Sequence, residues 1–265
     1  MLSLDLWPFN YETDGLVIGP VKQRGSQVSF SPEDFARTRK LFLAETVDVT
    51  SSQAIFRGLV YSMLTRSTSY SGQSRILTLF HSQGLDSPDT IAGREDLSQI
   101  IKIGASYPNR LASSLGDFAG EWWPSESERF IDGLRADSES GRNGMGSLRK
   151  DLCTTCPGFG HKCSSLFLRM CGYLSAVPLD RHGIRFLRDV ACKPVHIKYD
   201  KRRVRYDNKN KYTRGIRGKD YELYERRFSD FADEFKITPA VLQMLVYVHR
   251  TKWDHERHPF MQCAP

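Results

Sequence analysis

Two side chains that could form a covalent catalytic pair stand eighteen residues apart in the chain, Lys162 and Asp180. A neutral lysine amine is a nucleophile that forms imines with carbonyl carbons. A carboxylate near such an amine can take up a proton or stabilise a developing positive charge. The pair therefore predicts nucleophilic catalysis. The competing explanation is a solvated surface lysine together with an aspartate that caps the next helix, and an aspartate can serve both purposes.

The residues around Lys162 predict a helix-hairpin-helix. Residues 148–155 form the expected first helix, Pro157-Gly158-Phe159-Gly160 the hairpin, and residues 161–171 the second helix, which ends at Gly172. Glycine takes positive φ without strain, so the turn can be tight and can approach another molecule closely. The N–H groups at the start of the second helix form a site for an anion such as a DNA phosphate. Lys162 lies at this positive helix end, which favours its neutral, nucleophilic form.

These residues resemble the helix-hairpin-helix DNA glycosylases that use a catalytic Lys and Asp. Within that superfamily they are most similar to the small, all-helical 8-oxoguanine glycosylase/lyases of archaea and some bacteria. Weaker similarity extends from about Ile55 to Trp253, over most of the chain. The residues that carry the resemblance are Gly158-Phe159-Gly160-His161-Lys162, Ser164-Ser165, Leu168-Arg169, Gly172-Tyr173 and Leu179-Asp180-Arg181-His182.

The resemblance implies an all-α, two-lobed fold and an enzyme that extrudes and excises a modified base from double-stranded DNA. It further implies AP lyase activity through a Schiff base on Lys162, with Asp180 as the second catalytic residue and 8-oxoguanine repair as the first expectation. Contacts with the DNA backbone are expected from the hairpin and from the residues that follow Asp180, namely Gly158, Phe159, Gly160, His161, Arg181 and His182.

Two further groups of site residues follow from the resemblance. The polar loop at residues 65–70 matches a family loop that fills the gap left by the extruded base, which makes Arg66 and Tyr70 candidates; an ordinary interhelical loop is the alternative. The last helix of the family lines the base pocket with an acidic residue and a Trp. Gln243 and Tyr247 stand at those positions here, which departs from the 8-oxoguanine pattern.

The composition indicates a polyanionic partner. The 265 residues include 38 Lys and Arg against 31 Asp and Glu, which gives a net charge of +7. Thirteen Lys and Arg against five Asp and Glu fall within residues 193–227, where we expect a basic inserted hairpin or loop. Lys201, Arg202 and Arg203 are its candidates for DNA contact, since each neutralised phosphate adds salt-dependent affinity. A solvated charge run is the alternative.

Six cysteines raise the question of a metal or an iron–sulfur cluster. In relatives that carry a cluster its four cysteines follow the Asp, and only Cys192 and Cys263 do so here. We therefore expect no metal and no required cofactor, with buried free thiols instead, although a monovalent cation at the hairpin is compatible with the resemblance. No apolar run is long enough to span a bilayer and no secretory signal is evident, so a cytoplasmic, DNA-associated protein is expected. The resemblance implies a monomer.

Helix signals divide the rest of the chain. Residues 1–30 predict an irregular arm with short extended pieces. Helices are expected at 31–45, 52–64, 71–83, from Ser87, and at 96–103, 107–119, 126–136, 181–190, 220–234 and 239–249, with Trp122-Trp123-Pro124 and residues 138–146 as breaks on either side of the helix at 126–136. The expected division is an arm with the first helix at 1–50, a helical lobe at 51–140, the helix-hairpin-helix at 141–192, the basic insertion at 193–219 and the C-terminal helices at 220–265.

Two other functions remain open at this stage. The basic insertion and the altered pocket helix favour a glycosylase that removes a bulky hypermodified base, such as glucosylated hydroxymethylcytosine, from phage DNA in antiviral defence. A DNA-binding module without chemistry is the alternative from another class, and the presence of both Lys162 and Asp180 argues against it.

Overall fold

The computed structural model describes residues 15–18, 28–66, 68–190, 219–251 and 261. The chain divides into two compact units. We call the first the central unit, made of Lys40–Pro178 and His255–Pro265, and the second the flanking unit, made of Met1–Arg39 and Leu179–Asp254. The described residues are predominantly helical in both units, as predicted. The five-part division proposed from the sequence stays a prediction.

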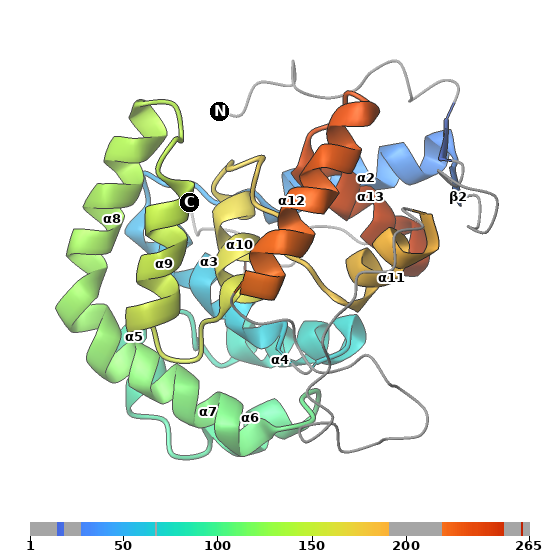
Figure 1. Ribbon diagram of the computed structural model, residues 1–265. Helices are drawn as coiled ribbons and strands as arrows, with labels where there is room; N and C mark the ends of the chain where they lie inside the picture. The colour runs from blue at the N-terminus through green and yellow to red at the C-terminus, as the bar shows by residue number, and fades with distance from the viewer. Residues whose placement is uncertain (1–14, 19–27, 67, 191–218, 252–260, 262–265) are drawn as a thin grey trace, which may run out of the picture. The chain divides into compact units, whose positions relative to one another are not determined.

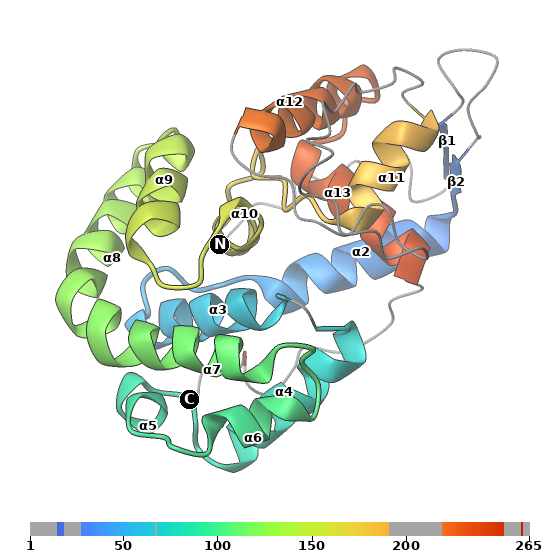
Figure 2. The ribbon, with the colours of Figure 1, turned by 60° about the horizontal axis from the view of Figure 1, so that its bottom comes forward.

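The central unit consists of helices joined by short turns. They are α3 (Ser52–Leu64), α4 (Tyr70–Ser82), α5 (Pro88–Ala92), α6 (Leu97–Lys102), α7 (Pro108–Asp117), the π-helix η2 (Phe118–Trp122), α8 (Trp123–Glu139), α9 (Met145–Thr155) and α10 (His161–Met170). Figure 1 shows α8 and α9 side by side with α10 next to α9, and Figure 2 shows α4, α6 and α7 grouped beside α3.

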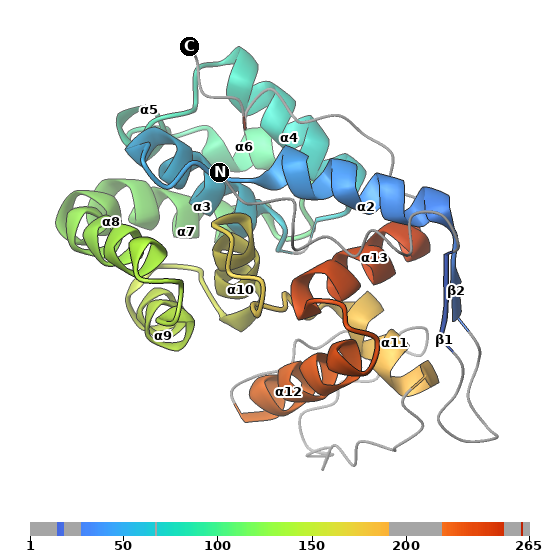
Figure 3. The same ribbon diagram turned by 90° about the horizontal axis from the view of Figure 1, so that it is seen from above.

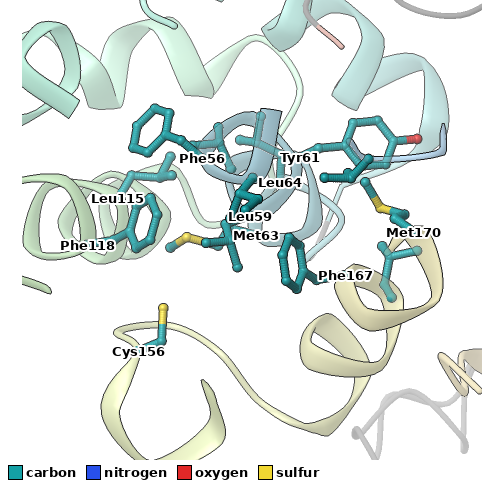
Figure 4. Packing of buried hydrophobic residues seen from close by; sticks show 14 of the residues in the cluster. Phe56, Leu59, Tyr61, Met63, Leu64, Leu115, Phe118, Cys156, Phe167 and Met170 are labelled. Atoms are coloured by element: carbon teal, nitrogen blue, oxygen red, sulfur yellow. The ribbon is translucent and has the colours of Figure 1, made fainter. Parts of the chain in front are cut away.

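Helix α3 forms the centre of the central unit. Ser51 caps its start by accepting a hydrogen bond from the Ala54 N–H, and every residue from Ala54 to Leu64 is buried. Figure 4 shows side chains of α3 packed between residues of α7 and α10. Gly58 permits this approach, because a Cβ there would lie 2.7 Å from Val47 Cγ2 and 3.3 Å from Phe167 Cε2.

A buried polar cluster adds specific contacts to this core. Arg169 of α10 forms an ion pair with Glu45, and the Tyr61 hydroxyl of α3 donates to the same carboxylate at 2.6 Å. A buried charge is costly unless it is paired and hydrogen-bonded, and Glu45 has both kinds of partner. The cluster therefore fixes how α10, which carries Lys162, lies against α3.

The predicted break at Trp122-Trp123-Pro124 is wrong. The backbone passes from α7 through η2 into α8 without leaving the helical region, and α8 begins at Trp123. At this junction the Trp123 N–H donates to the Phe118 carbonyl, the wider bond pattern of a π-helix. Proline has no N–H and clashes with the preceding turn of a regular helix, and the π-turn directly before Pro124 accommodates both effects.

The flanking unit contains three helices and a short hairpin. They are α11 (Arg181–Val190), α12 (Lys219–Glu234), α13 (Pro239–Thr251) and the antiparallel strands β1 (Leu16–Ile18) and β2 (Val28–Phe30). Figure 3 shows α13 next to both α11 and α12, in agreement with their contacts. Phe30 of β2 packs against Phe186 of α11 and His249 of α13. The two strands are extended pieces of the predicted arm.

Helix α2 (Pro32–Glu45) begins in the flanking unit, and the division between the units falls within it, after Arg39. Its start was correctly predicted from Ser31. The Ser31 hydroxyl accepts from the Asp34 N–H at 3.2 Å, and the Ser31 N–H donates to the Asp34 carboxylate at 3.1 Å. This reciprocal pair is a capping box, which satisfies two backbone donors of the first turn.

Candidate active site

The predicted hairpin lies between α9 and α10 in the central unit. The Phe159 N–H donates to the Cys156 carbonyl at 3.2 Å and closes a turn around Pro157 and Gly158. Gly158 has φ +76°, and a Cβ there would lie 2.8 Å from Ser114 Cβ of α7. Both the backbone conformation and the close contact require glycine at this position.

Lys162 lies in the first turn of α10, directly after the hairpin. Its Nζ donates to the Thr65 carbonyl at 3.5 Å, and its side chain is half-buried. Gly160 occupies the N-cap position and has no side chain with which to cap α10. The backbone donors of this first turn are therefore not capped by their own N-cap residue, which is the arrangement of an anion site at a helix N-terminus.

Arg66 lies against the hairpin. Its Nη1 donates a hydrogen bond to the Gly158 carbonyl, 92 positions along the chain. The sequence placed Arg66 in a loop that fills a gap in DNA, whereas the structure shows its guanidinium bound to the protein's own backbone. Tyr70, the other candidate of that loop, is the first residue of α4 and is half-buried behind the Ser69 cap.

The cysteines near the hairpin are free thiols. Cys156, Cys163 and Cys171 are buried, as predicted, whereas Cys153 is half-buried. Burial raises the pKa of the Cys163 thiol, while the neighbouring cations Lys162 and Arg66 oppose that effect. Burial likewise raises the pKa of Cys156 and of Cys171. Among the described residues no group of His, Cys, Asp and Glu has an arrangement that could hold a metal ion.

Asp180 starts α11 in the flanking unit. Its Oδ1 accepts hydrogen bonds from the His182 and Gly183 N–H groups, both at 2.9 Å, and its carbonyl accepts from the Ile184 N–H at 3.1 Å. Asp180 is therefore the N-cap of α11, which is the alternative to a catalytic role that the sequence left open. Both of these N–H groups bond Oδ1, so capping does not use Oδ2.

The segment around Asp180 is held from α12. The Tyr221 hydroxyl accepts from the Leu179 N–H at 3.0 Å, and Tyr221 is fully buried. A Cβ on Gly183 would lie 3.7 Å from Phe228 Cε2, so α11 packs closely on α12 at its first turn. These contacts hold the Asp180 carboxylate in a defined position in the flanking unit.

The two candidates for the base pocket lie on one face of α13. Gln243 is 4% exposed, and Tyr247, one helical turn later, is half-buried. The Tyr247 ring meets the His182 ring edge-on, with centroids 6.1 Å apart. Because His182 lies two residues after Asp180, this contact brings Tyr247 next to the start of α11. Gln243 points to the same side by helical spacing.

The remaining candidates have less structural description. Phe159 is half-buried against the core of the central unit, His161 is half-buried, and Gly160 is exposed. Arg181 is the first residue of α11, and the structure gives no account of its side chain. Lys201, Arg202 and Arg203 of the predicted basic insertion lie outside the described residues.

One exposed aromatic residue is not among the site residues predicted from the sequence. Tyr107, directly before α7, is 67% exposed. It is the N-cap residue of α7, the helix that carries Ser114, and Ser114 is the residue that approaches Gly158. A large aromatic ring exposed to water can mark an interaction surface, and this exposure is known only once the fold is known.

Comparisons with known proteins agree with this architecture. No family model matches the chain, and no curated protein matches it in sequence. A crystal structure of the Methanocaldococcus jannaschii 8-oxoguanine glycosylase/lyase with a 15mer DNA containing 8-oxoguanine matches with a TM-score of 0.55 and 19% identity, over 83% of this chain and 90% of the other. The chain has the fold of the helix-hairpin-helix DNA glycosylases.

A second solved structure, the 8-oxoguanine DNA glycosylase of Thermotoga maritima, also matches with a TM-score of 0.55, at 18% identity, over 82% of this chain and 88% of that one. Both neighbours cover most of the chain, so the similarity extends over the two units and is not confined to the hairpin. The fold predicted from the glycine turn, Lys162 and Asp180 is confirmed.

No helix in the described residues is both long and apolar enough to cross a membrane.

Proposed function

We propose that the protein is a DNA glycosylase that excises a modified base and then cleaves the strand through an imine formed on Lys162. The observation that carries the proposal is the placement of Lys162 in the first turn of α10, directly after a glycine hairpin, in a chain with the glycosylase fold. The hairpin and the α10 N-terminus bind DNA phosphate, and Lys162 supplies the nucleophile.

The proposed reaction uses few groups. The target nucleotide leaves the base stack, because its C1′ is out of reach within a duplex. As the glycosidic bond breaks, the Asp180 carboxylate stabilises positive charge on the sugar and takes up a proton from the Lys162 amine. The amine bonds to C1′, the sugar ring opens to give an imine, and loss of the C2′ proton breaks the C3′–O bond.

The modified base is the finer part of the proposal. The first candidate is 8-oxoguanine, since both solved neighbours are described as acting on it. A bulky hypermodified base of phage DNA is the second candidate. It is favoured by the neutral pair Gln243 and Tyr247 on α13 and by the excess of positive charge in residues 193–227. The proposed enzyme acts as a monomer, and its proposed chemistry uses no metal or organic cofactor.

Borohydride trapping on a panel of duplexes tests the proposal. The panel contains 8-oxoguanine, uracil, an abasic site, and natural DNA with hydroxymethylated or glucosylated cytosine, each assayed with wild type and Lys162→Gln. A Lys162-dependent adduct with the 8-oxoguanine duplex supports the first candidate. An adduct confined to the natural DNA with hydroxymethylated or glucosylated cytosine supports the second. Absence of trapping together with absence of released base would reduce the protein to a DNA-binding module.

A further inference from the structure

We propose that the turn at the end of α3, formed by Thr65 and Arg66, positions Lys162, and that Arg66 acts on the reaction through this turn. Arg66 is then a positioning residue and does not fill a gap in the DNA. The inference rests on the proposed function, because it assigns a role in the same reaction. It goes beyond that function by naming what holds the nucleophile.

Two hydrogen bonds join this turn to the hairpin and α10. The Lys162 Nζ donates to the Thr65 carbonyl at 3.5 Å, and Arg66 donates to the Gly158 carbonyl. The turn itself is fixed, since the Thr65 hydroxyl donates to the Ser62 carbonyl at 2.7 Å and the Arg66 N–H donates to the Met63 carbonyl at 3.0 Å.

The guanidinium of Arg66 is packed over the hairpin. A Cβ on Gly158 would lie 2.9 Å from Arg66 Nη1, so the group sits directly on the turn. If this side chain moved out into DNA, it would lose a charge-assisted hydrogen bond and leave the Gly158 carbonyl without it. A role inside the protein therefore explains its position better than a role in the duplex.

The contact with Lys162 has the properties of a resting position. A separation of 3.5 Å is at the weak end of hydrogen bonding, so the amine can leave the Thr65 carbonyl at small cost. The direction in which it leaves is set by the position of the first turn of α10 relative to Thr65. Arg66 fixes this relative position. Its guanidinium binds the hairpin, which leads into α10, and its backbone directly follows Thr65.

The experiment compares wild type, Arg66→Met, Arg66→Lys and the control Arg94→Met. Arg94 is a suitable control because its guanidinium pairs with Asp96 on the surface of the same unit, so the substitution removes the same charge. The rate of borohydride trapping is measured in a single turnover with an abasic-site duplex at saturating enzyme. Affinity and its salt dependence are measured with a tetrahydrofuran abasic analogue, which has no aldehyde and forms no imine.

We expect Arg66→Met to lower the saturated trapping rate about tenfold or more, since small displacements of a reacting group cost factors of this order. Affinity for the analogue stays within about twofold and the salt slope is unchanged, because no phosphate contact is lost. Arg66→Lys recovers part of the rate, since one donor can still reach the carbonyl, and Arg94→Met behaves as wild type. Circular dichroism establishes that each variant is folded.

Two results would overturn the inference while leaving the proposed function intact. The first is a saturated rate for Arg66→Met within about twofold of wild type. The second is a weaker affinity of Arg66→Met for the abasic analogue, with a salt slope reduced by about one unit and an unchanged trapping rate at saturating enzyme. That combination is the signature of a lost phosphate contact. If wild type itself forms no adduct with the abasic-site duplex, the proposed function fails and this inference fails with it.

Discussion

Substitution of Gly158 by alanine tests the hairpin geometry quantitatively. The residue has φ +76°, and the left-handed conformation costs a side chain about 1 to 2 kcal/mol. The new Cβ would also lie 2.8 Å from Ser114 Cβ, and overpacking of this kind costs about 1 to 3 kcal/mol. We therefore expect Gly158→Ala to lower the free energy of unfolding by about 2 to 5 kcal/mol.

Gly160→Ala is the matched control, two residues further along the same hairpin. Its φ is −148°, an ordinary extended conformation, and a Cβ there would have nothing within 4 Å. We expect its free energy of unfolding to fall by no more than about 1 kcal/mol, because alanine is a poorer N-cap than glycine. Urea unfolding followed by circular dichroism measures both variants, and affinity for duplex DNA is recorded alongside.

A double mutant separates the two causes. Ser114→Gly removes two of the three atoms nearest to the new Cβ, Ser114 Cβ at 2.8 Å and Oγ at 3.0 Å, and leaves Arg66 Nη1 at 2.9 Å; glycine within α7 itself costs about 1 kcal/mol. In the Gly158→Ala background it should therefore restore part of the overpacking cost of about 1 to 3 kcal/mol relative to the sum of the single effects, and leave the dihedral cost in place. Equal stability of the Gly158→Ala and Gly160→Ala proteins would refute the reasoning.

Three further predictions concern other parts of the molecule. Asp180→Asn keeps an oxygen for the cap of α11 and should leave the free energy of unfolding nearly unchanged, whereas Asp180→Ala should lower it by about 1 kcal/mol. Both variants should abolish base release in a gel assay. An active Asp180→Asn variant would contradict the role of the carboxylate charge. Burial raises the pKa of the Cys171 thiol, so stability present below the unfolded pKa of about 8.5 is lost as pH rises above it. Urea unfolding at pH 7.5 and 9.5 should show that Cys171→Ala loses about 1.4 kcal/mol less than wild type over this interval, and identical losses would count against a buried thiol. Tyr107→Ala should leave the free energy of unfolding within about 0.5 kcal/mol of wild type, because the ring is 67% exposed. If the start of α7 touches DNA, the variant should bind duplex about tenfold more weakly by fluorescence anisotropy. Unchanged affinity would show that Tyr107 is not part of the DNA interface.

Local signals in the sequence predicted the elements that carry the chemistry. Ser31 and Ser51 mark helix starts that the structure caps through their side chains, and Gly158 takes the positive φ that the turn needs. Asp180 caps α11, which begins at the predicted residue. Each of these depends on interactions within a few residues, so the sequence contains the information directly.

The parts that were missed depend on contacts between distant residues. The bond from Arg66 to the Gly158 carbonyl joins positions 92 apart, and that from Lys162 to the Thr65 carbonyl joins positions 97 apart. No spacing rule links such positions. Pro124 was read as a break because a π-turn that accommodates a proline has no local signature. The pairing of Tyr247 with His182 likewise follows only from the packing of α13 on α11.

The most direct test of the central claim is to locate the covalent bond between protein and DNA. Wild-type protein is trapped with borohydride on an abasic-site duplex, digested with protease and nuclease, and analysed by mass spectrometry. We predict a reduced sugar adduct on the peptide that contains Lys162 and no adduct with Lys162→Gln. An adduct on another amine, or equal trapping by the Lys162→Gln protein, would contradict the assignment of Lys162 as the nucleophile.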